Sequence, residues 1–189
     1  WALSPGHDVL PATAFKGTTA QGGLTAKQQV ERDLRHLCRD LGFSETLTYS
    51  FMGQSDYDLA GMPKDHPLRD SFAILNPLGE DSSIMRTTLL PSILKCMSLN
   101  AAHRNKDVKL FDLSKVYLRE EGNLLAREEK HLSLGVYGEG ADFFALKGCV
   151  EAILRQLRVP GVRYEANKGH FAFHPGRCAS LTVGEKFIG

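Results

Sequence analysis

His170 and His174 have the H-x₃-H spacing with which two imidazole rings on one helix can hold a metal ion. The residues around them do not favour a helix, since a glycine, two phenylalanines and a proline surround them. No third ligand is evident, so metal binding is the less favoured interpretation. We expect His174-Pro175-Gly176-Arg177 to form a rigid turn before a strand instead.

A second group of residues could bind phosphate. Tyr117-Leu118-Arg119-Glu120 places a guanidinium next to a carboxylate at the end of a predicted strand. A guanidinium donates two parallel hydrogen bonds to phosphate, so an arginine that faced a pocket here could hold the α-phosphate of ATP. The favoured alternative is a solvated strand end. Gly135-Val136-Tyr137-Gly138-Glu139-Gly140 is also glycine-rich, but we expect it to be a strand and its turn.

The remaining charged residues allow several roles. Arg86 could be functional, or it could pair with an acid such as Asp81 or Asp112. Lysines and arginines could also contact RNA, and the candidates for this are Arg104, Lys106, Lys109 and Arg177. The chain has 23 basic and 22 acidic side chains and a formal net charge of +1, whereas a dedicated nucleic-acid surface normally shows a basic excess. No Ser/His/Asp or Cys/His constellation and no P-loop is identifiable.

The four cysteines are far apart in the sequence, at Cys38, Cys96, Cys149 and Cys178. Zinc is not expected, because no pair has the ligand spacing of a zinc site. Most of them lie on predicted helix faces, where a free cysteine behaves as a small hydrophobe. We therefore expect reduced thiols in a cytoplasmic protein, with two disulfide bonds of a secreted protein as the alternative.

The length of 189 residues suits one domain with its own core and a short tail. No apolar run approaches the roughly 20 residues that a membrane-spanning helix needs. Trp1 is not an initiator methionine, and the sequence stops just after a strand-like run at Gly189. We therefore expect a fragment of a longer protein.

The elements that must position these residues follow from hydrophobic period and capping. Residues 1–23 are predicted to be an extended arm, and residues 24–189 a folded domain. Thr25 and Gln28 form a capping box before a helix that ends near Gly42. Further helices are predicted at 55–59, from Pro91 to about 103, and from Asp142 to just before Pro160. Strands are predicted at 46–51, 71–75, 108–117, 132–137 and 178–183. This order favours an α+β fold with a mainly antiparallel sheet flanked by helices.

Four segments in this order carry a resemblance. They are Ile84 to Leu94, Val108 to Leu113, Asp142-Phe143-Phe144-Ala145-Leu146-Lys147-Gly148, and Phe171 to Arg177. Together they resemble the catalytic-like module of the bacterial phenylalanyl-tRNA synthetase β subunit, from about Thr25 to the last residue. The resemblance implies a fold of the class II aminoacyl-tRNA synthetase catalytic core.

The resemblance also implies that the module is catalytically silent. In the family's catalytic copies an arginine directly follows an aromatic residue on a strand. Here Leu118 follows Tyr117, and Arg119 comes one position late, so it should face away from the pocket. Phe111-Asp112-Leu113 offers no basic residue, and the His174 turn stands where catalytic subunits have F-T-E-P.

By this resemblance the chain is part of a ligase of protein biosynthesis that attaches phenylalanine to tRNA. The module would be a scaffold in an α2β2 assembly whose α subunit binds ATP and Mg²⁺, with tRNA reached through the holoenzyme. It would have no catalytic residue, metal or cofactor of its own, and it could form a homodimer when isolated. Its structural or α-contacting residues would be Arg86, Pro91, Phe111, Asp112, Asp142, Phe143, His174, Pro175, Gly176 and Arg177. The alternatives are a module that contacts the tRNA acceptor arm and an active adenylate-forming ligase with divergent motifs.

Overall fold

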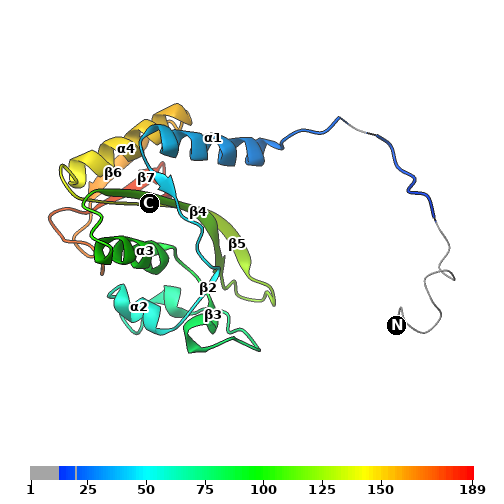
Figure 1. The fold of residues 1–189 in the computed structure, drawn as a ribbon, viewed down its shortest axis with the longest axis horizontal. Helices are drawn as coiled ribbons and strands as arrows, with labels where there is room; N and C mark the ends of the chain where they lie inside the picture. The colour runs from blue at the N-terminus through cyan, green and yellow to red at the C-terminus, as the bar shows by residue number, and fades with distance from the viewer. Residues whose placement is uncertain (1–12, 20) are drawn as a thin grey trace.

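The computed structural model describes residues 13–19 and 21–189. Residues 13–19 and 21–24 are exposed and form no helix or strand, and they extend away from the body of the molecule (Figure 1). The remainder of the predicted arm, residues 1–12 and residue 20, lies outside the described residues. The boundary between arm and domain stays a prediction.

The first helix, α1 (Ala26–Asp40), forms as its sequence predicts. The Thr25 hydroxyl accepts a hydrogen bond from the backbone N–H of Gln28, and the Gln28 side chain accepts one from the backbone of Thr25, which completes the capping box. After the helix ends, Gly42 adopts a φ of +84°, a conformation that favours glycine. The chain then turns into the central sheet.

The central sheet has the strand order β1 (Ser44–Glu45), β4 (Val108–Leu118) and β5 (Arg127–Tyr137). β1 pairs with β4 in parallel, and β4 pairs with β5 in antiparallel register over the full length of both strands. β5 therefore lies at one edge of this sheet. Both long strands are longer than predicted. β4 ends one residue after the predicted end at 117, and β5 begins five residues before the predicted start at 132.

Helices cover both faces of the central sheet (Figure 1). α1 and α4 (Phe143–Gln156) lie on one face, where Phe111 and Leu113 are buried among Cys38, Phe43 and Ile153. α3 (Leu90–Ala102) lies on the other face, where Ile93 packs on Val108 and Leu110. The alternation of side chains along β4 thus supplies two separate cores.

Close packing of α3 against β5 depends on Gly135. A Cβ atom at this position would lie 2.4 Å from the Met97 sulfur and 3.4 Å from the Ile93 Cδ1 atom, so a larger residue would require the Met97 side chain to move. In the turn after β5, Gly138 has a φ of +115°, and a Cβ there would lie 2.6 Å from the carbonyl oxygen of Lys106. The glycine-rich segment 135–140 is therefore a strand and its turn, as predicted.

A smaller unit lies beside the central sheet. It contains the strand pair β2 (Phe51–Met52) and β3 (Ile84–Met85), the helix α2 (Ser55–Leu59), and 3-10 turns at Pro67–Arg69 and Glu80–Ser82. Its core gathers Met52, Tyr57, Met62 and Ile84. No helix within the described residues is long and apolar enough to cross a bilayer.

The C-terminal part of the chain forms a third sheet. Its strand order is β6 (Val162–Ala166), β7 (Ala179–Val183) and β8 (Lys186–Phe187), antiparallel throughout. β7 corresponds to the predicted strand at 178–183. β6 and β8 were not predicted.

Two strand predictions need correction. Of the predicted strand at 46–51, only Phe51 belongs to a strand, because Thr46 and Thr48 use their hydroxyls to bond β4 instead of forming a regular ladder. The segment 71–75 contributes only an isolated bridge between Ala73 and Ile84. The fold is nevertheless α+β with mainly antiparallel pairing.

Candidate functional site

Asp112 is the polar centre of the fold. It lies in the middle of β4, and none of its surface is exposed. The hydroxyl groups of Thr48 and Ser114 each donate a hydrogen bond to its carboxylate, one to each oxygen. The Arg86 Nη1 atom lies 3.7 Å from the Asp112 Oδ2 atom, which makes a buried ion pair.

Arg86 links three segments of the chain. Its Nη1 atom donates to the Thr48 hydroxyl at 2.6 Å, and its Nε atom donates to the carbonyl oxygen of Lys115 at 2.9 Å. Its backbone N–H donates to the Ser50 carbonyl, and its own carbonyl accepts from the N–H of Tyr117. Burial lowers the pKa of Arg86, and the neighbouring Asp112 opposes this effect. We call Arg86, Asp112, Thr48 and Ser114 the arginine network.

The arginine network has little capacity for chemistry. Arg86 is 1% exposed, and each group in the network is held by protein hydrogen bonds. Of the two acids considered from the sequence, Asp112 is thus the partner of Arg86. Asp81 instead lines a groove with Tyr49 and Leu78. The hydrogen bonds of the network link Thr48 and Arg86 to β4.

Two other predicted residues are also buried. Pro91 lies at the first turn of α3, and Phe111 lies in the core beneath α1 and α4. Next to Arg86, the Thr87 hydroxyl and the Tyr57 hydroxyl are 2.8 Å apart, which joins the strand entry to α2. The sequence analysis did not identify Thr48, Ser114, Tyr57 or Thr87. Ser114 could have been found, since it lies two residues after Asp112 on the same strand face.

The structure places the degenerate motif at the end of β4. Tyr117 and Leu118 are the last two residues of the strand, and Arg119 follows it. The Arg119 Nε atom donates to Asp70 Oδ1 at 2.9 Å, and its guanidinium carbon lies 4.3 Å from the centre of the Phe72 ring. Through these contacts the Arg119 guanidinium packs against segment 70–72.

The last two groups of predicted residues lie on the surface. Asp142 caps α4 by accepting a hydrogen bond from the N–H of Ala145 at 2.7 Å, and Phe143 follows it. The segment 174–177 is exposed and closes a turn in which the Arg177 N–H donates to the His174 carbonyl. The Gly176 N–H also donates to the His174 ring nitrogen Nδ1. The predicted turn is therefore present.

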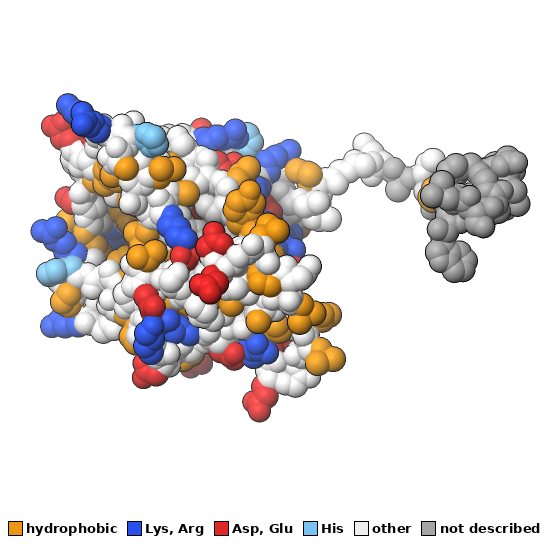
Figure 2. All heavy atoms as spheres, turned by 60° about the horizontal axis from the view of Figure 1, so that its bottom comes forward, with side chains coloured by type: hydrophobic (Ala, Val, Ile, Leu, Met, Phe, Trp, Pro, Cys, Tyr) orange, Lys and Arg blue, Asp and Glu red, His pale blue; other side chains and the backbone are white. Residues whose placement is uncertain are grey.

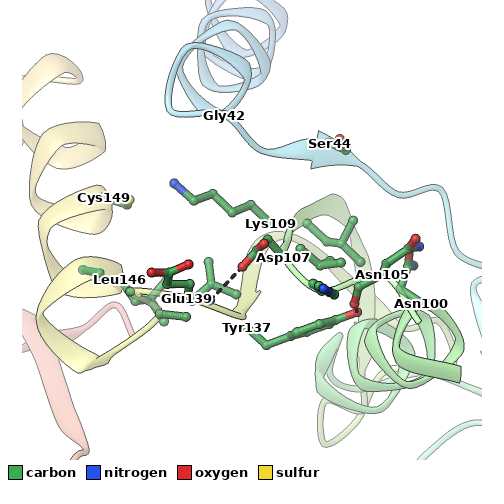
Figure 3. A pocket seen from close by; sticks show the side chains of 17 residues that line it. Gly42, Ser44, Asn100, Asn105, Asp107, Lys109, Tyr137, Glu139, Leu146 and Cys149 are labelled. Carbon is green, nitrogen blue, oxygen red and sulfur yellow. Dashed lines mark hydrogen bonds between the residues drawn. The ribbon is translucent and has the colours of Figure 1, made fainter. Parts of the chain in front are cut away.

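An open hollow of about 710 Å³ lies where α1, α3 and α4 meet one end of the sheet (Figure 3). Lys109 points toward the end of α1, and Asp107 accepts a hydrogen bond from the Glu139 N–H at 2.7 Å. Lys106 also lines the hollow, but Arg177 does not. The four basic residues considered for RNA contact are thus not all gathered here. No cluster of three metal-ligating side chains occurs within the described part of the chain.

Comparison with known proteins identifies the chain. A family model described as the phenylalanyl tRNA synthetase beta chain CLM domain matches residues 10–189. The chain belongs to this family. The CLM domain is 35% identical over 185 residues to the phenylalanine–tRNA ligase beta subunit of Clostridium tetani, and 36% identical over 199 residues to that of Symbiobacterium thermophilum. These matches cover 97% and 100% of the CLM domain but only 23% and 22% of the relatives.

Among solved structures, the CLM domain resembles pyrrolysyl-tRNA synthetase from Desulfitobacterium hafniense, with a TM-score of 0.69 and 16% identity. The match covers 86% of this chain and 57% of that one. At this level of identity the likeness concerns the fold. The CLM domain thus has the class II synthetase core fold that its sequence predicts.

Proposed function

We propose that the CLM domain is a catalytically silent scaffold within the β subunit of a phenylalanine–tRNA ligase. It would hold the α subunit of an α2β2 assembly in place, in the cytoplasm. The α subunit would bind ATP, Mg²⁺ and phenylalanine and form the adenylate. The holoenzyme would then transfer phenylalanine to tRNA.

One observation carries the proposal. The arginine network occupies the centre of the sheet face beside α3, where it fills the space with protein groups that already have partners. The cation of the degenerate motif, Arg119, forms an ion pair with Asp70. An active adenylate-forming site needs a cation that is free to meet phosphate. A scaffold needs only a rigid centre, which a satisfied buried pair supplies.

The test is ATP–pyrophosphate exchange with purified α subunit, β subunit and their complex. We expect exchange by the complex, none by the β subunit alone, and a stable complex in light-scattering chromatography. An Arg119→Ala variant of the β subunit should leave exchange by the complex unchanged. Exchange by the β subunit alone, lost on Arg119→Ala, would instead establish an active ligase.

A self-associated form is part of the same proposal. When the α subunit is absent, we expect the isolated domain to form homodimers, because obligate interfaces expose apolar surface when separated. Light scattering over a tenfold concentration range would detect this. Addition of α subunit should convert the homodimer to the mixed complex.

A further inference from the structure

Three histidines accept a backbone hydrogen bond through the same ring atom, Nδ1. They are His66, His170 and His174, and in each case the donor is the N–H group two residues later in the chain, at 3.1 to 3.2 Å. An imidazole nitrogen can accept a hydrogen bond only when it carries no proton, so each ring must be neutral with its proton on Nε2. A proton on Nδ1 would set one donor against another and break the contact.

Two of these histidines lie where two units of the fold meet. His66 precedes the 3-10 turn of the smaller unit, and His170 lies in the segment 167–178 that joins β6 to β7. The Phe171 ring contacts both rings, with centroid distances of 5.0 Å to His66 and 4.5 Å to His170. Phe171 also packs against the core of the smaller unit. We call His66, His170 and Phe171 the histidine latch, since they fasten segment 167–178 to the smaller unit.

The surroundings of His170 favour a neutral ring. Burial lowers the pKa of His170 from its ordinary value of 6.5, and His66 lowers it further because two positive rings repel one another. The His170 ring also stacks on Phe171 and Phe173, and stacking on a phenylalanine ring favours a charged imidazole. Burial and the His66 charge outweigh this attraction, because the pKa of His170 is lowered.

The charged side chains of the smaller unit do not oppose this preference. Asp58 pairs with Lys64 and Arg69, so its charge is balanced within the same unit. Asp65 precedes His66 in the chain and is exposed, so water and salt screen its charge. No carboxylate within the described residues forms an ion pair with His66 or His170. A protonated ring in the latch would therefore have no acid to hold it.

The other side of the latch is similar. Lys168 and Arg177, on the segment itself, are exposed. Lys130 and His131 of β5 line a groove with Phe173, and each contacts a carboxylate. Figure 2 shows acidic and basic side chains interspersed over one face of the molecule. A change in pH thus acts on the latch through its own rings and not through a large patch of one charge.

We propose that the histidine latch is a pH-controlled device, in which neutral His66 and His170 hold segment 167–178 on the smaller unit and a proton on either ring releases it. Because folding lowers the pKa of His170, the stability that the latch provides is complete above about pH 6.5 and is lost as the pH falls below it. Release would uncover the side of the smaller unit's core on which Phe171 packs. The inference does not depend on the scaffold role.

The experiment is hydrogen exchange of the full-length β subunit at about pH 7.5 and about pH 5.5, on either side of the ordinary histidine pKa. Mass spectrometry with fragmentation resolves the amides of Leu68 and Ala172, which donate to the two rings, and each rate is corrected for the intrinsic rate at that pH. The variants are His66→Asn and His170→Asn, singly and together. An asparagine oxygen can accept the same hydrogen bond and does not titrate. The control is His103→Asn, at an exposed histidine after α3.

In the parent protein we expect the protection of both amides to fall about fivefold or more at the lower pH, since one histidine can lose at most about tenfold one pH unit below its ordinary pKa. The double variant should keep the same protection at both pH values, and His103→Asn should behave like the parent. Constant protection in the parent would overturn the inference, as would an undiminished fall in the double variant. If the double variant does not fold, the single variants decide: each should reduce the fall, and no reduction in either would overturn the inference.

Discussion

On one side of β4, Phe111 and Leu113 pack among apolar residues of α1 and α4, whereas on the other side Asp112 faces Arg86. The apolar side gains stability from area removed from water and tolerates changes of similar volume. The polar side depends on four groups that must all be present, because a buried charge without its partner is costly. One strand therefore carries both a tolerant core and an intolerant one.

The largest effect should come from breaking the ion pair. Arg86→Met leaves the Asp112 carboxylate buried without a cation, and we expect a loss of about 3–5 kcal/mol in the free energy of unfolding. Urea denaturation measures the loss, and Arg163→Met on the exposed surface is the control. Adding Asp112→Leu should restore much of the stability, because both charges are then absent. A loss below about 1 kcal/mol for Arg86→Met would contradict the intolerance of this side.

The apolar side can be broken by a cavity. Leu113→Ala should cost about 2–5 kcal/mol, because the surrounding side chains relax only partly. In contrast, Leu113→Met keeps the volume and should cost less than about 1.5 kcal/mol. Urea denaturation of both variants separates the two sides of β4. Equal losses would show that this side is as intolerant as the arginine network.

The pH dependence of stability tests the apolar side of β4, where the Cys38 thiol is buried. Burial raises the pKa of the Cys38 thiol to about 11 from its ordinary value of 9.0. The unfolded chain therefore loses this proton first, and the stability that the neutral thiol provides is complete below pH 9 and lost as the pH rises toward 11. The full loss of unfolding free energy is on the order of 3 kcal/mol. The Cys38→Ala variant should lose less unfolding free energy than the parent protein between pH 9 and pH 11. Parallel curves of unfolding free energy against pH for the two proteins would refute this expectation.

The smallest effect concerns one hydroxyl of the polar side. Ser114→Ala removes one hydrogen bond to the Asp112 carboxylate and keeps the ion pair. We expect a loss of about 1.5–2 kcal/mol, in the lower range for hydrogen bonds to charged groups. Urea denaturation is again the measurement, with Ser98→Ala on the exposed side of α3 as the matched control. A loss as large as that of Arg86→Met would mean that the four groups act as one unit.

Features that depend on residues close in sequence could be predicted from the sequence. The α1 helix follows from local signals, namely the Thr25 capping box and the spacing of Leu34, Leu37 and Cys38. The turn at 174–177 and the Asp142 cap are local as well, and both were predicted. Local hydrogen bonds and helical period are readable without a tertiary structure.

Features set by distant residues were harder to predict. Arg86 had two candidate partners in the sequence, and only the fold selects Asp112. Thr48 was assigned to a strand, but its hydroxyl serves Asp112 across 64 positions of sequence. β6 was missed although Val162, Tyr164 and Ala166 alternate with polar residues, and β8 has only two residues. Such short strands are defined by their partners more than by their own sequence.

The position of β5 has a consequence for the handling of this chain. Within the described residues its outer edge pairs with no strand, so alternate residues of this eleven-residue strand, about half of them, point their backbone N–H and C=O groups at the free edge. A long bare edge is a template for polymerisation into cross-β fibrils. Charged side chains from Arg127 to Lys130 act as gatekeepers on the first part of the strand, while Leu132 to Tyr137 carry no charge. Peptides of the second part are therefore the place to look for amyloid nucleation.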